Sequence, residues 1–272
     1  MENSATRRDR APAESPYVLD NAGKEASARF PALSVLFDAG TIRHFEALGV
    51  SPGWRCLEIG GGGGSVASWL AARVGPTGHV LVTDIDPRFL ESLHLENVEV
   101  RRHDIATDPL PEAAFDLVHA RLVLVHVLQR ERALAQMIAA LRPGGWLLDE
   151  EFDSSVFPDP ALGPGEVLSK THLAMTRVMD DRGVDRNFGR RLFGLMRTLG
   201  LVDVAAEGRT IMFSAGSAGP SLLRSNYEQL HDAMIGAGYI TEQDFRADLA
   251  RLDDPEFTLP SPVLWAVRGR RP

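Results

Sequence analysis

The sequence predicts an α/β fold in which a mostly parallel sheet carries helices on both of its faces. Apolar strand-like segments alternate with helix-like segments from Arg55 to about Asp153. The first strand-like segment runs into five consecutive glycines, and the second, His79–Asp84, ends in an acid. Strands that alternate with helices pair in parallel through right-handed crossovers, so these features together favour one open sheet.

The glycine segment is the most informative part of the chain. Residues 56–65 read Cys-Leu-Glu-Ile-Gly-Gly-Gly-Gly-Gly-Ser, with strand character in Arg55–Ile59 and helix-forming composition in Ser65–Val74. A strand, a glycine turn and a helix place backbone N–H groups and a helix N-terminus beside a ligand. A Cβ atom would block both the turn and the approach of that ligand. A plain glycine-rich linker is the alternative, and the apolar strand directly before it argues against a linker.

The spacing of the glycines indicates which ligand. The pattern Glu-x-Gly-x-Gly-x-Gly is met in full by Glu58, Gly60, Gly62 and Gly64. The dinucleotide pattern Gly-x-Gly-x-x-Gly/Ala is met only loosely, from Gly62 to Ala67. The first pattern resembles motif I of class I S-adenosylmethionine (SAM) methyltransferases.

Two further acids follow strand-like segments at suitable places. Asp84 lies 24 residues after Gly60, where a carboxylate can accept hydrogen bonds from ribose hydroxyls. Asp86, two residues on, suits the start of the next helix instead. Residues 98–105 predict a third strand that runs into a polar turn, and Asp104 is placed there to accept from an adenine amino group.

The fourth and fifth strand-like segments extend the resemblance. Residues 115–120 read Phe-Asp-Leu-Val-His-Ala, and residues 141–149 place a Pro-Gly-Gly turn before an apolar strand. The resemblance covers about residues 50–155 and is to the ubiquinone/menaquinone-biosynthesis type and related bacterial small-molecule methyltransferases. It implies a Rossmann-like seven-stranded mostly parallel sheet with a final antiparallel strand. It also implies SAM as cofactor, S-adenosylhomocysteine as product, and cofactor contacts from Ile85, Ile105 and Ala120.

Composition sets the wider bounds. The formal net charge of −8 argues against a general nucleic-acid binder, because phosphate affinity depends on clustered Lys and Arg. The single cysteine, Cys56, excludes an internal disulfide framework and fits a reducing compartment such as the cytoplasm. No stretch approaches 18 uninterrupted apolar residues, so we expect no membrane span. Residues 1–14 predict a disordered tail without a signal peptide.

The remaining segments predict a helical cap before the sheet and a helical insertion after it. Residues 15–50 carry helical patterning, and the resemblance implies two helices there that close over the cofactor. Residues 51–272 are expected to form the SAM-binding domain. After the fifth strand we expect helices at 166–180 and 190–199, strand material at 201–204 and 210–213, helices at 221–235 and 241–252, and a last strand at 263–268. The helical pair at about 220–252 is interpreted as a substrate lid or, equally, as an oligomer contact, for instance in a homodimer.

Methyl transfer from a sulfonium is an in-line displacement, so the main task is alignment, and a base is needed only for some acceptors. His126 and Glu151 are the preferred candidate bases, since both follow strands at the ligand edge of the sheet. Strand alternation sends one of Glu150 and Glu151 toward the pocket and leaves open which one. The other candidates are His119, Asp153 and His172. Glu58 can bind the glycine-loop N–H groups or the amino group of the methionine part, and Arg121 can meet its carboxylate. The acids between Asp149 and Asp153 could hold a divalent metal, but no further ligands match, so we expect none.

The sequence therefore predicts a class I SAM-dependent methyltransferase that acts on a small organic, aromatic or partly hydrophobic molecule, such as a secondary metabolite. A SAM-binding regulatory or partner protein without catalysis is the main alternative, and a nicotinamide-dependent reductase is a third. No Asn/Asp-Pro-Pro-Tyr/Phe segment of the kind that resembles base-directed methyltransferases follows the fourth strand.

Overall fold

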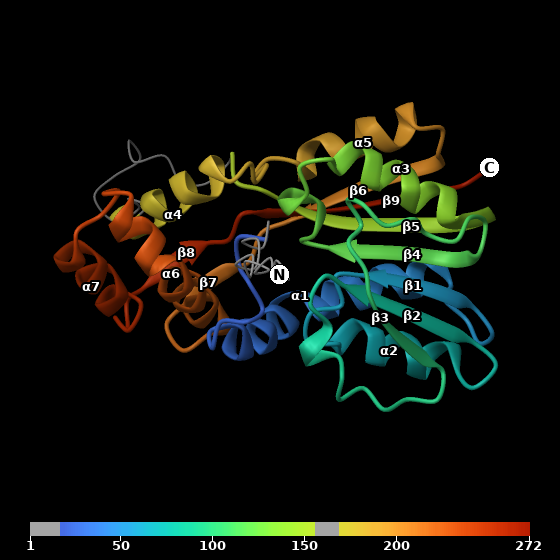
Figure 1. Cartoon of the computed structure of the whole chain (residues 1–272), viewed down its shortest axis with the longest axis horizontal. Helices are drawn as coiled ribbons and strands as arrows, with labels where there is room; N and C mark the ends of the chain where they lie inside the picture. The colour runs from blue at the N-terminus through green and yellow to red at the C-terminus, as the bar shows by residue number, and fades with distance from the viewer. Residues whose placement is uncertain (1–16, 156–168) are drawn as a thin grey trace, which may run out of the picture.

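The computed structural model describes residues 17–155 and 169–272, and its centre is one seven-stranded sheet (Figure 1). The strand order is β3-β2-β1-β4-β5-β9-β6. The strands are β1 (Arg55–Ile59), β2 (His79–Asp84), β3 (Val98–Arg102), β4 (Phe115–Arg121), β5 (Leu141–Asp153), β6 (Val202–Arg209) and β9 (Val263–Arg270). Neighbours from β3 to β5 pair in parallel, and β9 runs antiparallel to both β5 and β6. The predicted fold class is confirmed.

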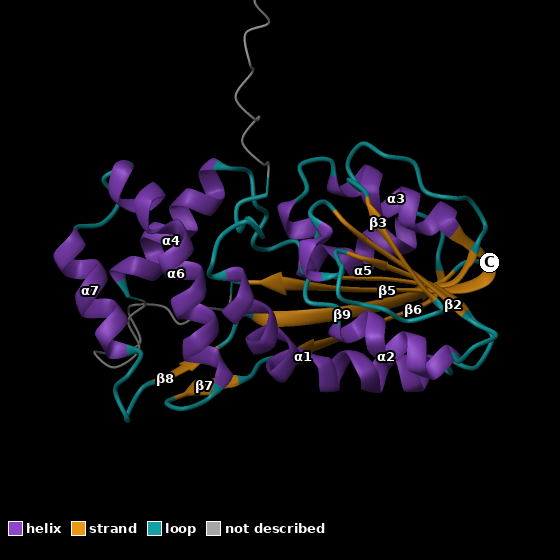
Figure 2. Cartoon of the chain, turned by 60° about the horizontal axis from the view of Figure 1, so that its bottom comes forward, coloured by secondary structure: helices purple, strands orange, loops and turns teal. Residues whose placement is uncertain are grey.

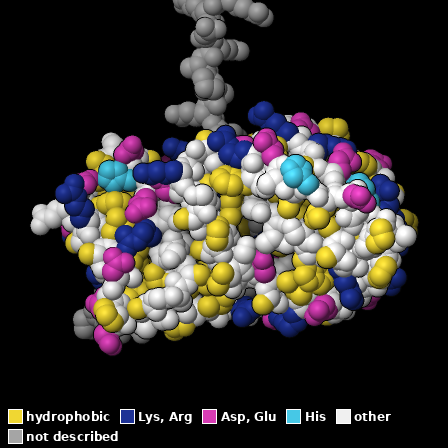
Figure 3. Space-filling model, turned by 90° about the horizontal axis from the view of Figure 1, so that it is seen from below, with side chains coloured by type: hydrophobic (Ala, Val, Ile, Leu, Met, Phe, Trp, Pro, Cys, Tyr) yellow, Lys and Arg dark blue, Asp and Glu magenta, His cyan; other side chains and the backbone are white. Residues whose placement is uncertain are grey.

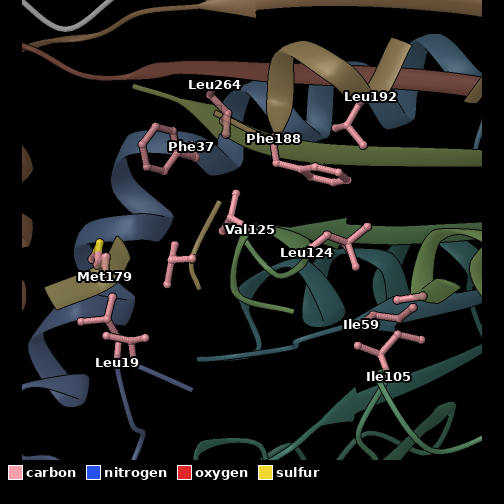
Figure 4. Close-up of a cluster of buried hydrophobic side chains, with 14 of the residues drawn as sticks. Leu19, Phe37, Ile59, Ile105, Leu124, Val125, Met179, Phe188, Leu192 and Leu264 are labelled. Atoms are coloured by element: carbon pink, nitrogen blue, oxygen red, sulfur yellow. The ribbon is translucent and has the colours of Figure 1, made fainter. Parts of the chain in front are cut away.

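Helices cover both faces of the sheet (Figure 2). On one face, α2 (Ser65–Val74) and the end of α1 (Ala26–Leu48) pack in a cluster around Phe45 and Leu70. On the other face, α3 (Arg130–Ala140) and α5 (Gly189–Thr198) pack in a larger cluster. Figure 4 shows part of this second cluster, with Leu124 and Val125 near Phe188 and Leu192.

A second group of elements lies at one end of the sheet, on the left of Figures 1 and 2. It consists of α4 (Lys170–Asp181), α6 (Ala218–Gly236), α7 (Glu242–Arg251) and a small sheet of β7 (Met212–Ser214) with β8 (Thr258–Pro260). Helix α6 packs on both α1 and α4. Segments between β6 and β9 therefore meet the helix that precedes β1, which closes this end of the molecule.

The structure differs from the sequence prediction before the first strand. Two helices were expected between residues 15 and 50, whereas the described residues there form one long helix, α1, that continues through Pro31 and Gly40. Gly40 lies close to the Arg209 guanidinium, at 3.0 Å from where its Cβ would stand, and Thr41 bonds into the site described below. Tertiary packing therefore outweighs the weak helix propensity of these positions.

Other boundaries shift by smaller amounts. The strand material expected at 210–213 belongs to the separate β7–β8 sheet, because Val202–Arg209 fills the edge position beside β9. Helix α4 begins at Lys170, and residues 166–168 of the expected helix lie outside the described residues, as does the expected tail at 1–14. Within the described ranges, none of the helices combines the length and the apolar character needed to cross a membrane.

Candidate cofactor and acceptor site

A cavity of about 470 Å³ opens at the carboxyl ends of β1, β2 and β4. It runs from the glycine loop to α4 and α6, which lie far away in the sequence. Predicted site residues in its wall are Glu58, Gly60, Gly62, Asp84, Ile85, Asp104, Ile105, Arg121 and His126. Three other predicted residues, Gly64, Ala120 and Glu151, are not in the wall. Most of the predicted residues are thus brought to one edge of the sheet.

The backbone conformation of the glycine loop accounts for the spacing of its glycines. Gly60, Gly62 and Gly64 have φ values of 70°, 52° and 80°, in the left-handed region that side chains rarely adopt. Gly61 has no such φ, but a Cβ there would collide with the Val82 side chain. The N–H groups of Gly60 and Gly61 both donate to the Thr83 carbonyl, at 2.8 and 3.0 Å. The loop is thereby tied to the end of β2, with bare backbone facing the cavity.

The ring of Phe30, from α1, packs against the loop and lines the same cavity. A Cβ on Gly62 would stand 2.9 Å from Phe30 Cε1, and one on Gly63 would stand 2.8 Å from Phe30 Cβ. A ligand that lies on this loop therefore meets α1 as well as the sheet. A side chain at either glycine would collide with Phe30, so glycine keeps the loop backbone bare beside the cavity, as a nucleoside-type cofactor requires.

Asp84 sits beside this loop at the end of β2. Its Oδ2 accepts from Gly62 N at 3.0 Å, and its Oδ1 accepts from Asp86 N at 2.9 Å. Burial raises the pKa of Asp84, and these backbone hydrogen bonds oppose the rise. Each carboxylate oxygen keeps a further lone pair for a ligand. The predicted contact with ribose hydroxyls is compatible with this position and stays a prediction.

The loop after β3 contributes Asp104, Ile105 and a residue that the sequence analysis did not single out, His103. Asp104 Oδ1 accepts from Ala106 N at 2.9 Å, so its carboxylate is partly used by its own turn. His103 is buried in the cavity wall, and neither ring nitrogen has a hydrogen-bond partner among the described residues. Only its position directly before Asp104 could have indicated it.

A buried charge network lies beneath the cavity. His119 in β4 is fully buried, with Nδ1 2.6 Å from Glu58 Oε2 and Nε2 3.2 Å from Glu150 Oε2. Burial alone would lower the pKa of His119, but the charges and hydrogen bonds of Glu58 and Glu150 outweigh it and raise the pKa to about 9. The imidazole is therefore a cation at neutral pH. Glu58 uses one oxygen on His119, and no loop N–H group donates to its carboxylate in the described chain.

The network continues to Arg121. Thr41 donates to Glu150 Oε2 at 2.5 Å, and Arg121 donates to Thr41 Oγ1 at 2.9 Å and to Asp38 Oδ1 at 2.8 Å. Arg121 lines the cavity but is already engaged with a carboxylate. The predicted contact of Arg121 with the methionine carboxylate stays a prediction, and the ion pair with Asp38 competes with that contact.

His126 ends the short 3₁₀ helix η2 (Leu124–His126) after β4. Its ring contacts the Tyr17 ring edge-on at 4.9 Å between centroids, and both residues line the cavity. Its Nδ1 has no hydrogen-bond partner within the described ranges. Burial, with the nearby charges of Arg29 and Arg130, lowers the pKa of His126 to about 4, so its imidazole is neutral at pH 7.

Glu151 occupies a different position from the one expected of a base. Its side chain is fully buried outside the cavity wall, and its oxygens accept from Val123 N at 3.0 Å, Leu124 N at 2.5 Å and Val125 N at 3.4 Å. The carboxyl group of Glu151 is therefore engaged by the backbone of the loop that carries His126. This position does not fit the predicted role of Glu151 as a base. Strand alternation turned Glu151 toward this loop and Glu150 toward His119.

The same alternation divides the acids that could have held a metal. Asp149 and Glu151 lie on one face of β5, and Glu150 lies on the other. Among the residues that the structure describes, no group of three or more His, Cys, Asp or Glu side chains is placed to bind a metal ion.

The far end of the cavity is mainly apolar. Its wall there comes from β5, α4, β7 and α6, with the side chains of Phe152, Met175, Met179, Phe213, Leu222 and Leu223. Two polar residues, His172 and Asn226, join this wall, and Asn226 Oδ1 is buried without a hydrogen-bond partner in the described chain. Leu222 and Leu223 fall in the predicted lid, while Phe152, Phe213 and Asn226 had no distinguishing local pattern.

Comparisons with known proteins agree with this geometry. A sequence profile of the methyltransferase domain matches residues 57–149. The ubiquinone/menaquinone biosynthesis C-methyltransferase UbiE of Ectopseudomonas mendocina is 38% identical over 115 residues, which cover 39% of this chain and 45% of that protein. An uncharacterised 37.1 kDa protein from a Streptomyces fradiae transposon is 30% identical over 203 residues, covering 72% of this chain and 56% of that protein. The chain thus spans about half the length of the curated relatives that it matches.

Solved structures share the fold. Phosphoethanolamine N-methyltransferase 2 of Haemonchus contortus, in complex with phosphomonomethylethanolamine and S-adenosylhomocysteine, superimposes with a TM-score of 0.60 at 16% identity. The match covers 96% of this chain and 61% of that one. At this identity the likeness concerns the fold alone.

Proposed function

We propose that this chain, whose methyltransferase domain belongs to the class I SAM-dependent family, transfers a methyl group from SAM to a small organic acceptor. The observation that carries the proposal is the continuity of the cavity. One space of about 470 Å³ joins the glycine loop and Asp84 to an apolar wall from α4 and α6. A protein that only bound the cofactor would have no need of this second compartment.

The acceptor that fits this compartment is largely apolar with few polar groups. Its wall combines Phe152, Phe213 and two methionines with the polar side chains of His172 and Asn226. The relatives named for ubiquinone and menaquinone biosynthesis match between 39% and 49% of this chain, so their acceptor does not transfer to it. We propose an aromatic or partly hydrophobic molecule, and we leave open whether carbon, oxygen or nitrogen is methylated.

When bound, SAM supplies an electrophilic methyl group on a sulfonium sulfur. The residues of this chain would hold the reactants in line, and such positioning can lower a barrier by about 7–11 kcal/mol. His126 is neutral at pH 7, and its side chain lines the cavity that both ligands would share. Its weak basicity suits an acceptor whose proton becomes acidic only as the new bond to the methyl group forms.

Basic and acidic side chains are interspersed over the face of the molecule seen in Figure 3. This pattern supports a small-molecule acceptor over a nucleic acid, which favours a continuous basic surface. The homodimer and the cytoplasmic location expected from the sequence stay predictions.

Calorimetric titration with SAM tests the cofactor assignment. We expect Asp84→Ala to weaken SAM binding by about tenfold or more, because it removes the anchor of Gly62 N–H and the predicted ribose acceptor. Asp86→Ala is the matched control, since its carboxylate lies outside the cavity wall, and NADH is the control ligand. Binding of NADH in place of SAM would contradict the methyltransferase proposal and favour the nicotinamide-dependent reductase.

Loss of His126 should separate catalysis from binding. With an acceptor found by screening organic compounds for S-adenosylhomocysteine release, we expect His126→Asn to lower kcat by about 10²-fold or more with the Kd for SAM unchanged. His94→Asn, an exposed histidine, is the control. An unchanged kcat would remove the base role, and absence of turnover with every compound would favour the non-catalytic alternative.

A further inference from the structure

Arg29 is the most deeply buried charged side chain in the cavity wall, at 1% exposed. Its guanidinium donates to Gln229 Oε1, to the Leu19 carbonyl at 2.8 Å and to Asn21 Oδ1 at 3.2 Å. All three acceptors are neutral. Across residues 17–155 and 169–272, no carboxylate oxygen lies within the 4.0 Å of an ion pair with Arg29.

The other arginines of the wall are different. Arg121 pairs with Asp38 at 2.8 Å, and Arg186 pairs with Asp180 at 2.9 Å. A guanidinium stays charged at any ordinary pH, and a buried charge without a counter-charge is costly. The described chain compensates this cost at Arg121 and Arg186 but not at Arg29, which leaves a positive site in the wall.

We propose that Arg29 is the anion-binding residue of this cavity and that it pairs with a carboxylate or similar oxyanion of a bound ligand. The inference rests on the proposed function, because two ligands of that function can bring the anion. One source is the carboxylate of the amino-acid part of SAM. The other is an oxyanion on the acceptor.

The surroundings of Arg29 are compatible with both sources. Through Phe30, the next residue, α1 reaches the glycine loop. Through Gln229, Arg29 contacts α6, which also places Leu222, Leu223 and Asn226 in the cavity wall. Arg29 thus contacts the helix that carries part of the apolar wall, and its charge contributes to the lowered pKa of His126.

Paired ligands that differ only in the anion test the proposal and distinguish the sources. For the cofactor arm, the Kd of S-adenosylhomocysteine is compared with that of its decarboxylated analogue, which keeps the ammonium group. For the acceptor arm, acetate, benzoate and phosphate are titrated against acetamide and benzamide, with and without S-adenosylhomocysteine. Each titration is made with the whole chain, with Arg29→Met and with Arg29→Lys, which keeps the charge.

We expect Arg29→Met to weaken at least one anionic ligand by about tenfold while its neutral counterpart changes little, and Arg29→Lys to recover part of the loss. A loss confined to S-adenosylhomocysteine assigns the cofactor carboxylate, and a loss confined to the added oxyanions assigns the acceptor. Equal weakening of charged and neutral ligands would show a structural role and overturn the proposal, as would anion affinities identical to those of the wild type. Arg73→Met, at the exposed end of α2, is the control.

The experiments distinguish a failure of the proposed methyltransferase function from a failure of the anion-binding role of Arg29. A wild-type chain that bound neither S-adenosylhomocysteine nor its analogue would contradict the proposed function, whereas the oxyanion titrations would still test Arg29.

Discussion

Glu151 holds the backbone that presents His126. Its carboxyl group is fully buried and takes three consecutive N–H groups, from Val123 to Val125. The residue before them, Leu122, has a φ of 58°, a conformation unusual for a branched side chain. The hydrogen bonds to Glu151 therefore fix a strained turn at the edge of the cavity, where a loose turn would misplace His126.

Replacement of Glu151 should separate charge from hydrogen bonding. Burial and the neighbouring Asp149 raise the pKa of Glu151 well above its usual range, so a neutral side chain of the same shape is a good substitute. We expect Glu151→Gln to change the free energy of unfolding little and Glu151→Leu to lower it by about 3 kcal/mol, because buried N–H groups lose their acceptor. Urea unfolding at neutral pH measures both, and a Leu variant as stable as the wild type would contradict this role.

At the scale of elements, one chain of hydrogen bonds joins three strands to α1. Glu58 in β1 and His119 in β4 are partners in the sheet register, and Glu150 lies diagonally across from His119 in the neighbouring strand β5. Thr41 in α1 donates to Glu150. The buried cation stands between two buried anions, so each partner offsets the desolvation of the others. Cofactor loop, sheet and cap are thereby connected by charge as well as by apolar packing.

Replacement of the buried His119 cation should lower the stability of the fold by an amount that depends on pH. We expect His119→Gln to lower the free energy of unfolding by about 3–5 kcal/mol, because Glu58 and Glu150 lose their counter-charge. The pKa of about 9 in the folded chain is raised above the ordinary value, so this stabilisation is complete below about pH 6.5 and is lost as the pH rises through 9.

Denaturant unfolding from about pH 6 to 9 measures this difference. The gap between wild type and His119→Gln should narrow as the pH rises. Thr41→Val removes the hydrogen bond from a neutral hydroxyl to the Glu150 carboxylate, and it should show a gap with little pH dependence over this range, because the lowered pKa of Glu150 keeps that group ionised throughout. A constant gap for His119→Gln would mean that the imidazole is not a cation in the fold.

The sequence predicted the elements whose local signals agree with their final environment. The strand, glycine turn and helix from Arg55–Ile59 to Ser65–Val74 carry both pattern and turn chemistry, and the structure has the same boundaries. The two helices expected within residues 15–50 rested on the family resemblance, whereas the structure has one helix there that continues through Pro31 and Gly40. The small β7–β8 sheet pairs residues more than forty positions apart, a partnership that no local pattern encodes.

At the scale of the whole molecule, the cavity forms where two distant parts of the chain meet. The cofactor end comes from the strand–loop motifs between residues 55 and 126, and these could be predicted because each motif is local. The acceptor end comes from α4, β7 and α6, and Arg29 joins it from α1. Their side chains look like ordinary core or surface residues in the sequence, since only the tertiary fold brings them together.

The stability of the whole molecule also depends on an acid that no ligand explains. Asp149 lies in the middle of the sheet, between Ala120 and Val267, fully buried. Neither carboxyl oxygen has a hydrogen-bond partner in the part of the chain that the structure describes. Burial, opposed by the charge of His119 and reinforced by that of Glu150, raises the pKa of Asp149 to about 8.

This acid should make the fold less stable as the pH rises. Between its ordinary pKa and about 8, folded Asp149 holds a proton that the unfolded chain has lost, so the free energy of unfolding falls by up to about 1.4 kcal/mol per pH unit. An amide side chain at this position cannot ionise. We therefore expect the free energy of unfolding of Asp149→Asn to increase relative to that of the wild type from about pH 5 to 8, and the difference to stay constant above pH 8. Burial of the amide changes the stability of the variant by the same amount at every pH. The test is therefore the change of the stability difference with pH, and not its size at one pH. Asp203→Asn, at an exposed position, should give a flat difference, and a flat difference for Asp149→Asn would mean that Asp149 is ionised in the fold.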